Sequence, residues 1–199
     1  EGRTGLRNSM TLANVAYGKR FFMDGGVPSL ELQVLAPIHD ENEMDHSILE
    51  IIKELEEDEE IVKLAAIAYD RPVDPFVITR SIASFMRTMI SGNSRYDQYI
   101  NGDSAVFNQQ EVRGLAVFTD QNCTSCHSGF MLSDGDFHNI GLYEEYADMG
   151  RERITYTSND NGKFKICVSE PGIQTYNVSG VGACCQGDTG VSIFLSGST

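Results

Sequence analysis

The chain has 199 residues and a net charge of −14, from 15 basic and 29 acidic side chains. This charge argues against a nucleic-acid partner, whose phosphates it would repel, and favours a basic protein partner. No apolar run approaches the roughly 18 residues needed to cross a bilayer, so we expect no membrane span.

The first strong helical pattern follows residue 47. Ser47 with Glu50 is a capping-box pair, and apolar residues then repeat at the spacing of one helical face. Those apolar residues are Ile48, Ile51, Ile52 and Leu55. The same region is acidic, because 11 of the 29 carboxylates lie between Asp40 and Glu60. We interpret this run first as a solvated helix face.

Three more helix starts follow. Asp58 begins a helix through 61–68, and Asp74-Pro75 begins another, because proline suits the first helical position. Gly92 is expected to end that helix. Its predicted apolar face, with both methionines as core residues, is Ile78, Ile82, Phe85, Met86 and Met89. A fourth helix is capped by Asn108 and Glu111, and its apolar face is Val112, Leu115, Ala116 and Phe118.

After residue 128 the helical periodicity fades into Gly, Asn, Asp and Ser. Residues 167–199 change composition again, since they contain no Lys or Arg and six Gly. The pattern therefore predicts an all-α fold with an irregular C-terminal segment.

The fourth helix leads directly to Cys123-Thr124-Ser125-Cys126-His127, the Cys-x-x-Cys-His pattern of c-type haem attachment. Two thiols three positions apart on a helical turn can form thioethers with the two vinyl groups of one porphyrin. The next residue, His127, then lies under the iron as its proximal ligand. We predict one covalently attached haem c here.

Two other interpretations of this pattern remain open. A thioredoxin-type redox pair needs a βαβ setting, which the helical context does not offer. A zinc site could use Cys123, Cys126 and His127 with a fourth ligand. The candidates for that fourth ligand are Cys167, Cys184 and Cys185.

The stretch from Gly5 to about Lys165 resembles the bacterial di-haem cytochrome c peroxidases and the related MauG proteins. The blocks that carry the resemblance keep their order and spacing. They are residues 7–12 (RNSMTL), 21–25 (FFMDG), 29–38 (SLELQVLAPI), 43–44 (EM), 91–94 (SGNS), 113–118 (RGLAVF), the 123–127 motif and 137–141 (FHNIG).

The resemblance implies two cytochrome c-like domains with one haem each, in an exported, periplasmic enzyme. The N-terminal haem reacts with hydrogen peroxide, and the C-terminal haem takes electrons from a small donor protein of the cytochrome c or cupredoxin type. The resemblance divides this chain into three parts. They are a remainder of the peroxidatic domain with connecting helices (1–105), an electron-transfer haem domain (106–166) and an unassigned tail (167–199). A homodimer is also compatible with the family.

The resemblance further implies roles for three polar residues. Gln33 and Glu43 match the polar residues of the peroxide pocket, where Glu43 would move protons during O–O cleavage and Gln33 would hold hydrogen bonds. Asn8 matches a side-chain ligand of a structural calcium ion between the domains.

The sequence departs from the family in three places. No Cys-x-x-Cys-His precedes residue 123, so we expect a mature or truncated chain, with the second haem on a segment ahead of Glu1. Met23 stands where the family usually has a Trp between the haems. The family's later segment, which supplies a Met on the far side of the electron-transfer haem, is not found after Lys165.

Three functions are therefore compatible with the sequence. The first is a peroxidase, or part of one, that reduces hydrogen peroxide to water through haem. The second is a single-haem electron carrier, and the third is a MauG-like enzyme that oxidises residues of a partner protein. Gln33 and Glu43 favour the peroxidase, because a carrier does not need a proton shuttle.

Overall fold

A computed structural model describes residues 2–166 of the chain. This part is mostly helical, with one small antiparallel sheet in which Phe137 is opposite Lys165. The helices are α1 (Leu30–His39), α2 (Ile48–Glu56), α3 (Glu59–Tyr69), α4 (Pro75–Thr88), α5 (Arg95–Ile100), α6 (Gln109–Asp120) and α7 (Glu152–Thr155). The strands are β1 (Phe137–His138) and β2 (Phe164–Lys165). Short 3-10 turns are η1 (Val15–Tyr17), η2 (Ser104–Val106), η3 (Cys123–Ser125) and η4 (Ser158–Asp160).

Helices α1 to α4 form an N-terminal body with two apolar clusters. In the first, α1 packs against α4 around Leu30 and Ala83, which are 2% and 0% exposed. The other members of this cluster are Phe21, Val34, Ile38 and Met86. The second cluster joins α3 to the start of α4 through Ala65, Val73, Val77 and Ile78. The predicted face of α2 packs against both clusters.

The predicted helix starts are confirmed. The side chains of Ser47, Asp58, Asp74 and Asn108 each accept hydrogen bonds from backbone N–H groups in the first turn of a helix. These bonds satisfy donors that a helix start leaves without a partner inside the helix. Of these four caps, only Asn108 forms a full capping box, with Glu111 bonding back to the Asn108 N–H. The capping box predicted for Ser47 and Glu50 is wrong, because the Ser47 side chain accepts only from the Leu49 N–H.

Two predictions for α4 are wrong. The helix ends at Thr88 rather than Gly92, and Met89 is 37% exposed instead of buried. The buried stripe runs through Val77, Ile78, Ala83 and Met86, so Ile82 and Phe85 face outward. The reason is the position of α1, which packs close to the small Ala83. The face of α4 that this contact buries differs from the predicted apolar face.

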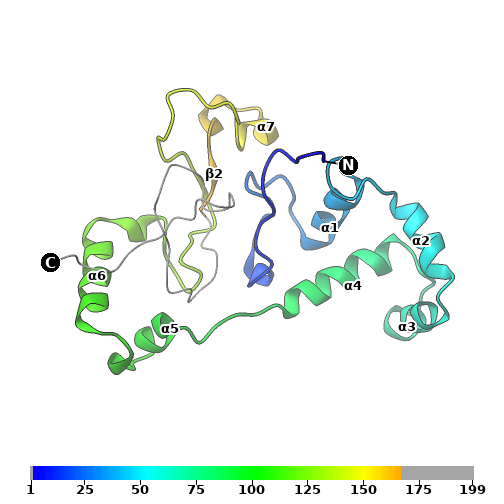
Figure 1. Cartoon of the computed structure of the whole chain (residues 1–199), viewed down its shortest axis with the longest axis horizontal. Coiled ribbons are helices and arrows are strands. Elements are labelled where there is room, and N and C mark those ends of the chain that lie inside the picture. Colours follow the sequence, from blue (N-terminus) through cyan, green and yellow to red (C-terminus); the bar gives the residue numbers. More distant parts are fainter. Residues whose placement is uncertain (1, 167–199) are drawn as a thin grey trace.

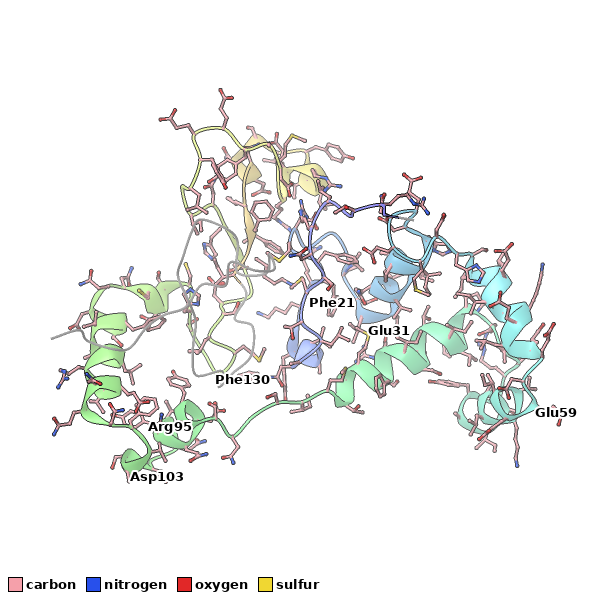
Figure 2. All side chains as sticks on the ribbon, in the orientation of Figure 1. Phe21, Glu31, Glu59, Arg95, Asp103 and Phe130 are labelled. Atoms are coloured by element: carbon pink, nitrogen blue, oxygen red, sulfur yellow. The ribbon has the colours of Figure 1, made fainter. Side chains whose placement is uncertain are left out.

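After α4 an extended stretch leads to α5 and α6, which stand apart from the N-terminal body (Figure 1). Figure 2 labels Arg95 and Asp103 in this part of the chain. The Arg95 guanidinium donates to the carboxylate of Glu111, with one bond of 2.7 Å, and to the carbonyl of Val106. The rings of Tyr99 and Phe107 stack at 4.4 Å between centroids. These contacts fix α5 and η2 against the start of α6.

The chain then returns to the N-terminal body through an ion-pair cluster centred on Arg7. The Arg7 guanidinium bonds both oxygens of Asp148, at 2.6 and 2.7 Å, and one oxygen of Asp24 at 2.6 Å. The ring of Phe164 lies 5.2 Å from the guanidinium carbon. We call Arg7, Asp24 and Asp148 the Arg7 clamp; it connects three segments that are distant in sequence.

Hydrogen bonds to backbone carbonyls next to the Arg7 clamp also join residues 151 and 165 to residues 23 and 24. The Lys165 N–H donates to the Met23 carbonyl at 2.7 Å, and Arg151 donates to the Asp24 carbonyl at 2.9 Å. Gly25 has φ +70°, and a Cβ there would lie 2.1 Å from the Phe137 ring. Glycine is therefore required at this position both for its conformation and for the space it leaves.

Across residues 2–166, no helix is long and apolar enough to cross a membrane.

Candidate functional site

The Cys-x-x-Cys-His sequence forms a tight turn directly after α6. Asn122 adopts the left-handed conformation, with φ 59°, so the chain leaves the direction of α6 there. The 3-10 turn η3 begins at the next residue. The His127 N–H then donates to the Cys123 carbonyl at 3.0 Å, which closes one helical turn. Both thiols are half-buried and free of disulfides. The predicted spacing therefore places Cys123, Cys126 and His127 on one turn.

The His127 ring is held by a single backbone acceptor. Its Nδ1 lies 3.1 Å from the Leu132 carbonyl oxygen, so Nδ1 carries the proton and Nε2 has its lone pair available. The Phe118 ring packs beside it, with centroids 5.9 Å apart. A backbone carbonyl on one ring nitrogen is the usual way in which a metal-binding histidine is oriented.

The surroundings of this turn fit a large apolar cofactor. Helix α6 has no buried residue, although it carries an apolar face. On that face Val112 is 40% exposed and Leu115 and Phe118 are half-buried, while Val117 and Phe130 outside it are 58% and 57% exposed. Figure 2 shows Phe130 beside η1, where its ring contacts Tyr17 at 4.8 Å. An apolar face next to two thiols and an oriented imidazole is what a covalently attached haem requires.

A second cluster of polar groups adjoins Cys126. The Asp134 N–H donates to the Cys126 carbonyl at 2.9 Å, and His138 Nε2 lies 2.7 Å from the Asp134 carboxylate. Burial raises the pKa of Asp134, but the Asp136 N–H and the neighbouring His138 and His127 lower it more, so its pKa lies below the usual range. Asp134 is therefore ionised at neutral pH.

Gln33 and Glu43 lie in a different part of the molecule. Gln33 is half-buried within α1, and Glu43 is exposed on the turn that follows that helix. This turn folds back on α1, because the His46 N–H donates to the Ile38 carbonyl at 2.8 Å. Figure 1 shows α1 in the N-terminal body, away from α6 and the turn after it. The structure thus does not bring these two residues to Cys123.

Asn8 is exposed and follows Arg7 in the N-terminal segment. Its calcium role stays a prediction. Cys167, Cys184 and Cys185, the alternative zinc ligands, lie outside the described residues.

Sequence reasoning missed the Arg7 clamp and the pair of Asp134 with His138. Arg7 begins the first block that resembles the family, but its partners are 17 and 141 positions away. No local pattern marks such partners. The Asp134-Gly135 pair is typical of a turn, and it could have indicated that the chain reverses there and brings His138 back toward Cys126.

A mostly helical fold with a Cys-x-x-Cys-His turn has the features of the class of c-type haem proteins. The family model of the di-haem cytochrome c peroxidases matches residues 1–105, just over half of the chain. The chain belongs to this family, as its sequence resemblance implied.

Two curated relatives and one solved structure show how far the similarity extends. The methylamine utilization protein MauG of Methylophilus methylotrophus is 32% identical over 76% of this chain and 46% of its own length. The cytochrome c peroxidase Ccp of Escherichia coli K12 is 30% identical over 83% of this chain and 37% of its own length. The chain thus spans less than half the length of these relatives.

The structure of a MauG-like protein associated with microbial copper homeostasis superposes with a TM-score of 0.73. It is 26% identical, and the match covers 84% of this chain and 55% of that one. The mostly helical fold of the described residues is therefore shared with this solved structure.

Proposed function

We propose that the chain is part of a di-haem cytochrome c peroxidase that reduces hydrogen peroxide to water with electrons from a small redox protein. The observation that carries this proposal is the turn at 123–127, with two free thiols and an imidazole held at Nδ1 beside a partly exposed apolar helix. The family supplies the reaction class. Residues 106–166 would form the electron-transfer domain, and the boundary at residues 105 and 106 stays a prediction.

When bound, haem c supplies one-electron redox chemistry at its iron. The residues of this chain hold and orient it. Cys123 and Cys126 would each form a thioether, and His127 would present Nε2 to the iron. The Leu132 carbonyl keeps the ring in that tautomer. Phe118 and the apolar face of α6 would exclude water from one side.

Gln33 and Glu43 would act at a second haem, on a segment ahead of Glu1. Reduction of hydrogen peroxide needs a proton moved from one peroxide oxygen to the other as the O–O bond breaks. The Glu43 carboxylate would carry that proton, and the Gln33 amide would hold hydrogen bonds in the pocket. Asn8 would contribute an oxygen ligand to a calcium ion. We infer a periplasmic location from the family.

A MauG-like oxidation of residues in a partner protein is the second candidate, favoured by the 32% identity to MauG. Measuring peroxide consumption distinguishes the peroxidase from the MauG-like enzyme. With the upstream segment restored and a reduced cytochrome c or cupredoxin as donor, a peroxidase consumes one peroxide for each two donor molecules oxidised. A protein that consumes peroxide only with a protein substrate, and no donor, would overturn our proposal.

Haem attachment is the first prediction. After maturation in a c-type haem background, the denatured chain is expected to retain haem stain and a pyridine haemochrome spectrum, because thioethers are covalent. Cys123→Ala should lower the covalent yield, and His127→Ala should remove normal proximal ligation. Cys184→Ala is the matched cysteine control and should change neither. Zinc without haem in elemental analysis would contradict the prediction.

Electrostatic steering of the electron donor is the second prediction. The acidic run at 40–60 lies over α2 and α3, at the opposite end of the molecule from α6 (Figure 1). We therefore expect it to attract a basic donor at long range rather than to contact it beside the haem. Electron-transfer rate should fall with rising salt, because screening limits the field to about 8 Å at physiological ionic strength.

Neutralising part of the run tests this prediction. Glu56 and Glu57 are exposed at the end of α2. The double variant Glu56→Gln, Glu57→Gln should slow the low-salt rate by about twofold or more and leave the high-salt rate unchanged. A stopped-flow rate that does not depend on salt would show that the donor docks through an apolar contact instead.

A further inference from the structure

One cluster of metal-binding groups includes two residues, Asp134 and His138, that have no role in the proposed peroxidase. The Cys126 thiol, a carboxylate oxygen of Asp134 and a ring nitrogen of His138 all lie within 4.8 Å of one another. We propose that, before haem is attached, these three residues form a site for a divalent cation of the Zn²⁺ class. Metal and haem would then compete for Cys126.

The fold brings the three groups together by short-range contacts. The Asp134 N–H bonds the Cys126 carbonyl, so the two residues are adjacent although eight positions apart. Gly135, at φ +76°, allows the chain to reverse, and His138 follows in β1. Strand β1 is itself fixed by β2, in which Phe164 is opposite His138. The site is therefore built on a constrained backbone.

The geometry suits a tetrahedral ion. Zinc binds thiolate, imidazole and carboxylate at about 2.0–2.3 Å, which places its ligand atoms roughly 3.3–3.8 Å apart. The present spread of up to 4.8 Å needs only small side-chain rotations to close. The pair of His138 and Asp134, now 2.7 Å apart, would open by under about 1 Å. Three protein ligands leave a fourth position for water.

The ligand set differs from the one that the Cys-x-x-Cys spacing suggests. Cys123 is not a member, and His127 has its Nδ1 bonded to Leu132. This difference separates our proposal from a general thiol chelate, because only one of the two cysteines is needed.

Competition with haem follows from the chemistry of the sulfur. Thioether formation adds the Cys126 sulfur to one vinyl carbon and its hydrogen to the other, with no net oxidation. Metal binding instead releases the thiol proton and uses the thiolate lone pair. Cys126 cannot do both, so a bound ion blocks one of the two thioethers. This competition rests on the proposed haem attachment, whereas the metal site does not.

The test uses the full 199-residue chain made without haem attachment and kept reduced. Cys167→Ser, Cys184→Ser and Cys185→Ser remove the other thiols. Titration with Co²⁺ alone should produce a thiolate-to-cobalt charge-transfer band and the visible bands of a tetrahedral ion, and Zn²⁺ should displace both. His138→Ala or Asp134→Asn should each weaken binding by roughly tenfold or more, and Cys126→Ala should abolish the charge-transfer band.

Two controls complete the test. Asp136→Asn removes an exposed neighbouring acid and should leave affinity within about twofold. Cys123→Ala should also leave it unchanged. Equal loss with Cys123→Ala and Cys126→Ala, or full affinity in His138→Ala, would overturn the site. Chain with haem attached should give no charge-transfer band, and its haemochrome yield reports attachment independently.

Discussion

Replacing Glu43 with glutamine is expected to lower peroxide turnover by about a hundredfold or more in protein that carries the upstream haem segment. A positioned carboxylate contributes about 10²–10⁴-fold to a proton transfer of this kind. Glutamine keeps the length and shape of the side chain but cannot accept the proton. The backbone of the turn should not change, because Glu43 holds it through its N–H, which donates to the Asp40 carbonyl at 3.0 Å.

Glu41→Gln is the matched control for this substitution. Glu41 lies on the same exposed turn, two positions earlier, and should give near-normal turnover. Both variants should retain two haems by pyridine haemochrome. Near-normal turnover in Glu43→Gln would assign the proton transfer to another group. Absence of turnover in the unsubstituted protein would instead favour the carrier or the MauG-like function.

Among the proposed substitutions, Arg7→Ala is expected to lower the free energy of unfolding the most. The Arg7 side chain is 15% exposed, and those of Asp24 and Asp148 are 8% and 27% exposed. Arg7→Ala would leave two carboxylates close together without their shared cation, and loss of the hydrogen-bonding partner of a partly buried charged group costs about 1–3 kcal/mol. Urea unfolding followed by circular dichroism measures this change. The control is Arg3→Ala, whose exposed pair with Asp45 should contribute about 0–1 kcal/mol.

The clamp should also make stability depend on pH. The hydrogen bond from Arg7, opposed by partial burial, holds the pKa of Asp148 below its ordinary value. A lowered folded-state pKa gives stability that is fully present above the unfolded pKa, near 4, and is lost as pH falls through the folded value. Unfolding free energy should therefore drop below about pH 4, and less so in Asp148→Asn. An equal acid response in both proteins would show that other carboxylates dominate.

Local signals explain what the sequence could predict. A cap such as Asn108 with Glu111, or the spacing from Cys123 to His127, involves neighbours within one turn, and the structure retains both. Helix α1 was not predicted from the sequence, because Pro37 lies inside it and its apolar residues show little preference for one face. The buried face of α4 depended on α1, which no local pattern specifies. The Arg7 clamp joins residues too distant for any periodicity to indicate.

The candidate site likewise has features that the local sequence predicted and features that it did not. The sequence motif identified the thiols and the imidazole, but not the Leu132 carbonyl that orients His127, since any residue can supply a carbonyl. Gln33 and Glu43 were assigned by resemblance alone. Their role stays a prediction, because the partner they would act on is not among residues 2–166.

The partly exposed apolar face of α6 has a consequence for the order of maturation. The N-terminal body has its own apolar clusters and can fold when α4 is complete. Among residues 2–166 no such cluster lies around Cys123, so we expect the porphyrin to complete the packing there. A turn that cannot bury itself remains accessible to the machinery that attaches haem, and the attached ring then becomes the core on which the segment closes. We therefore expect attachment to be the last folding step of this half of the chain rather than an addition to a finished domain.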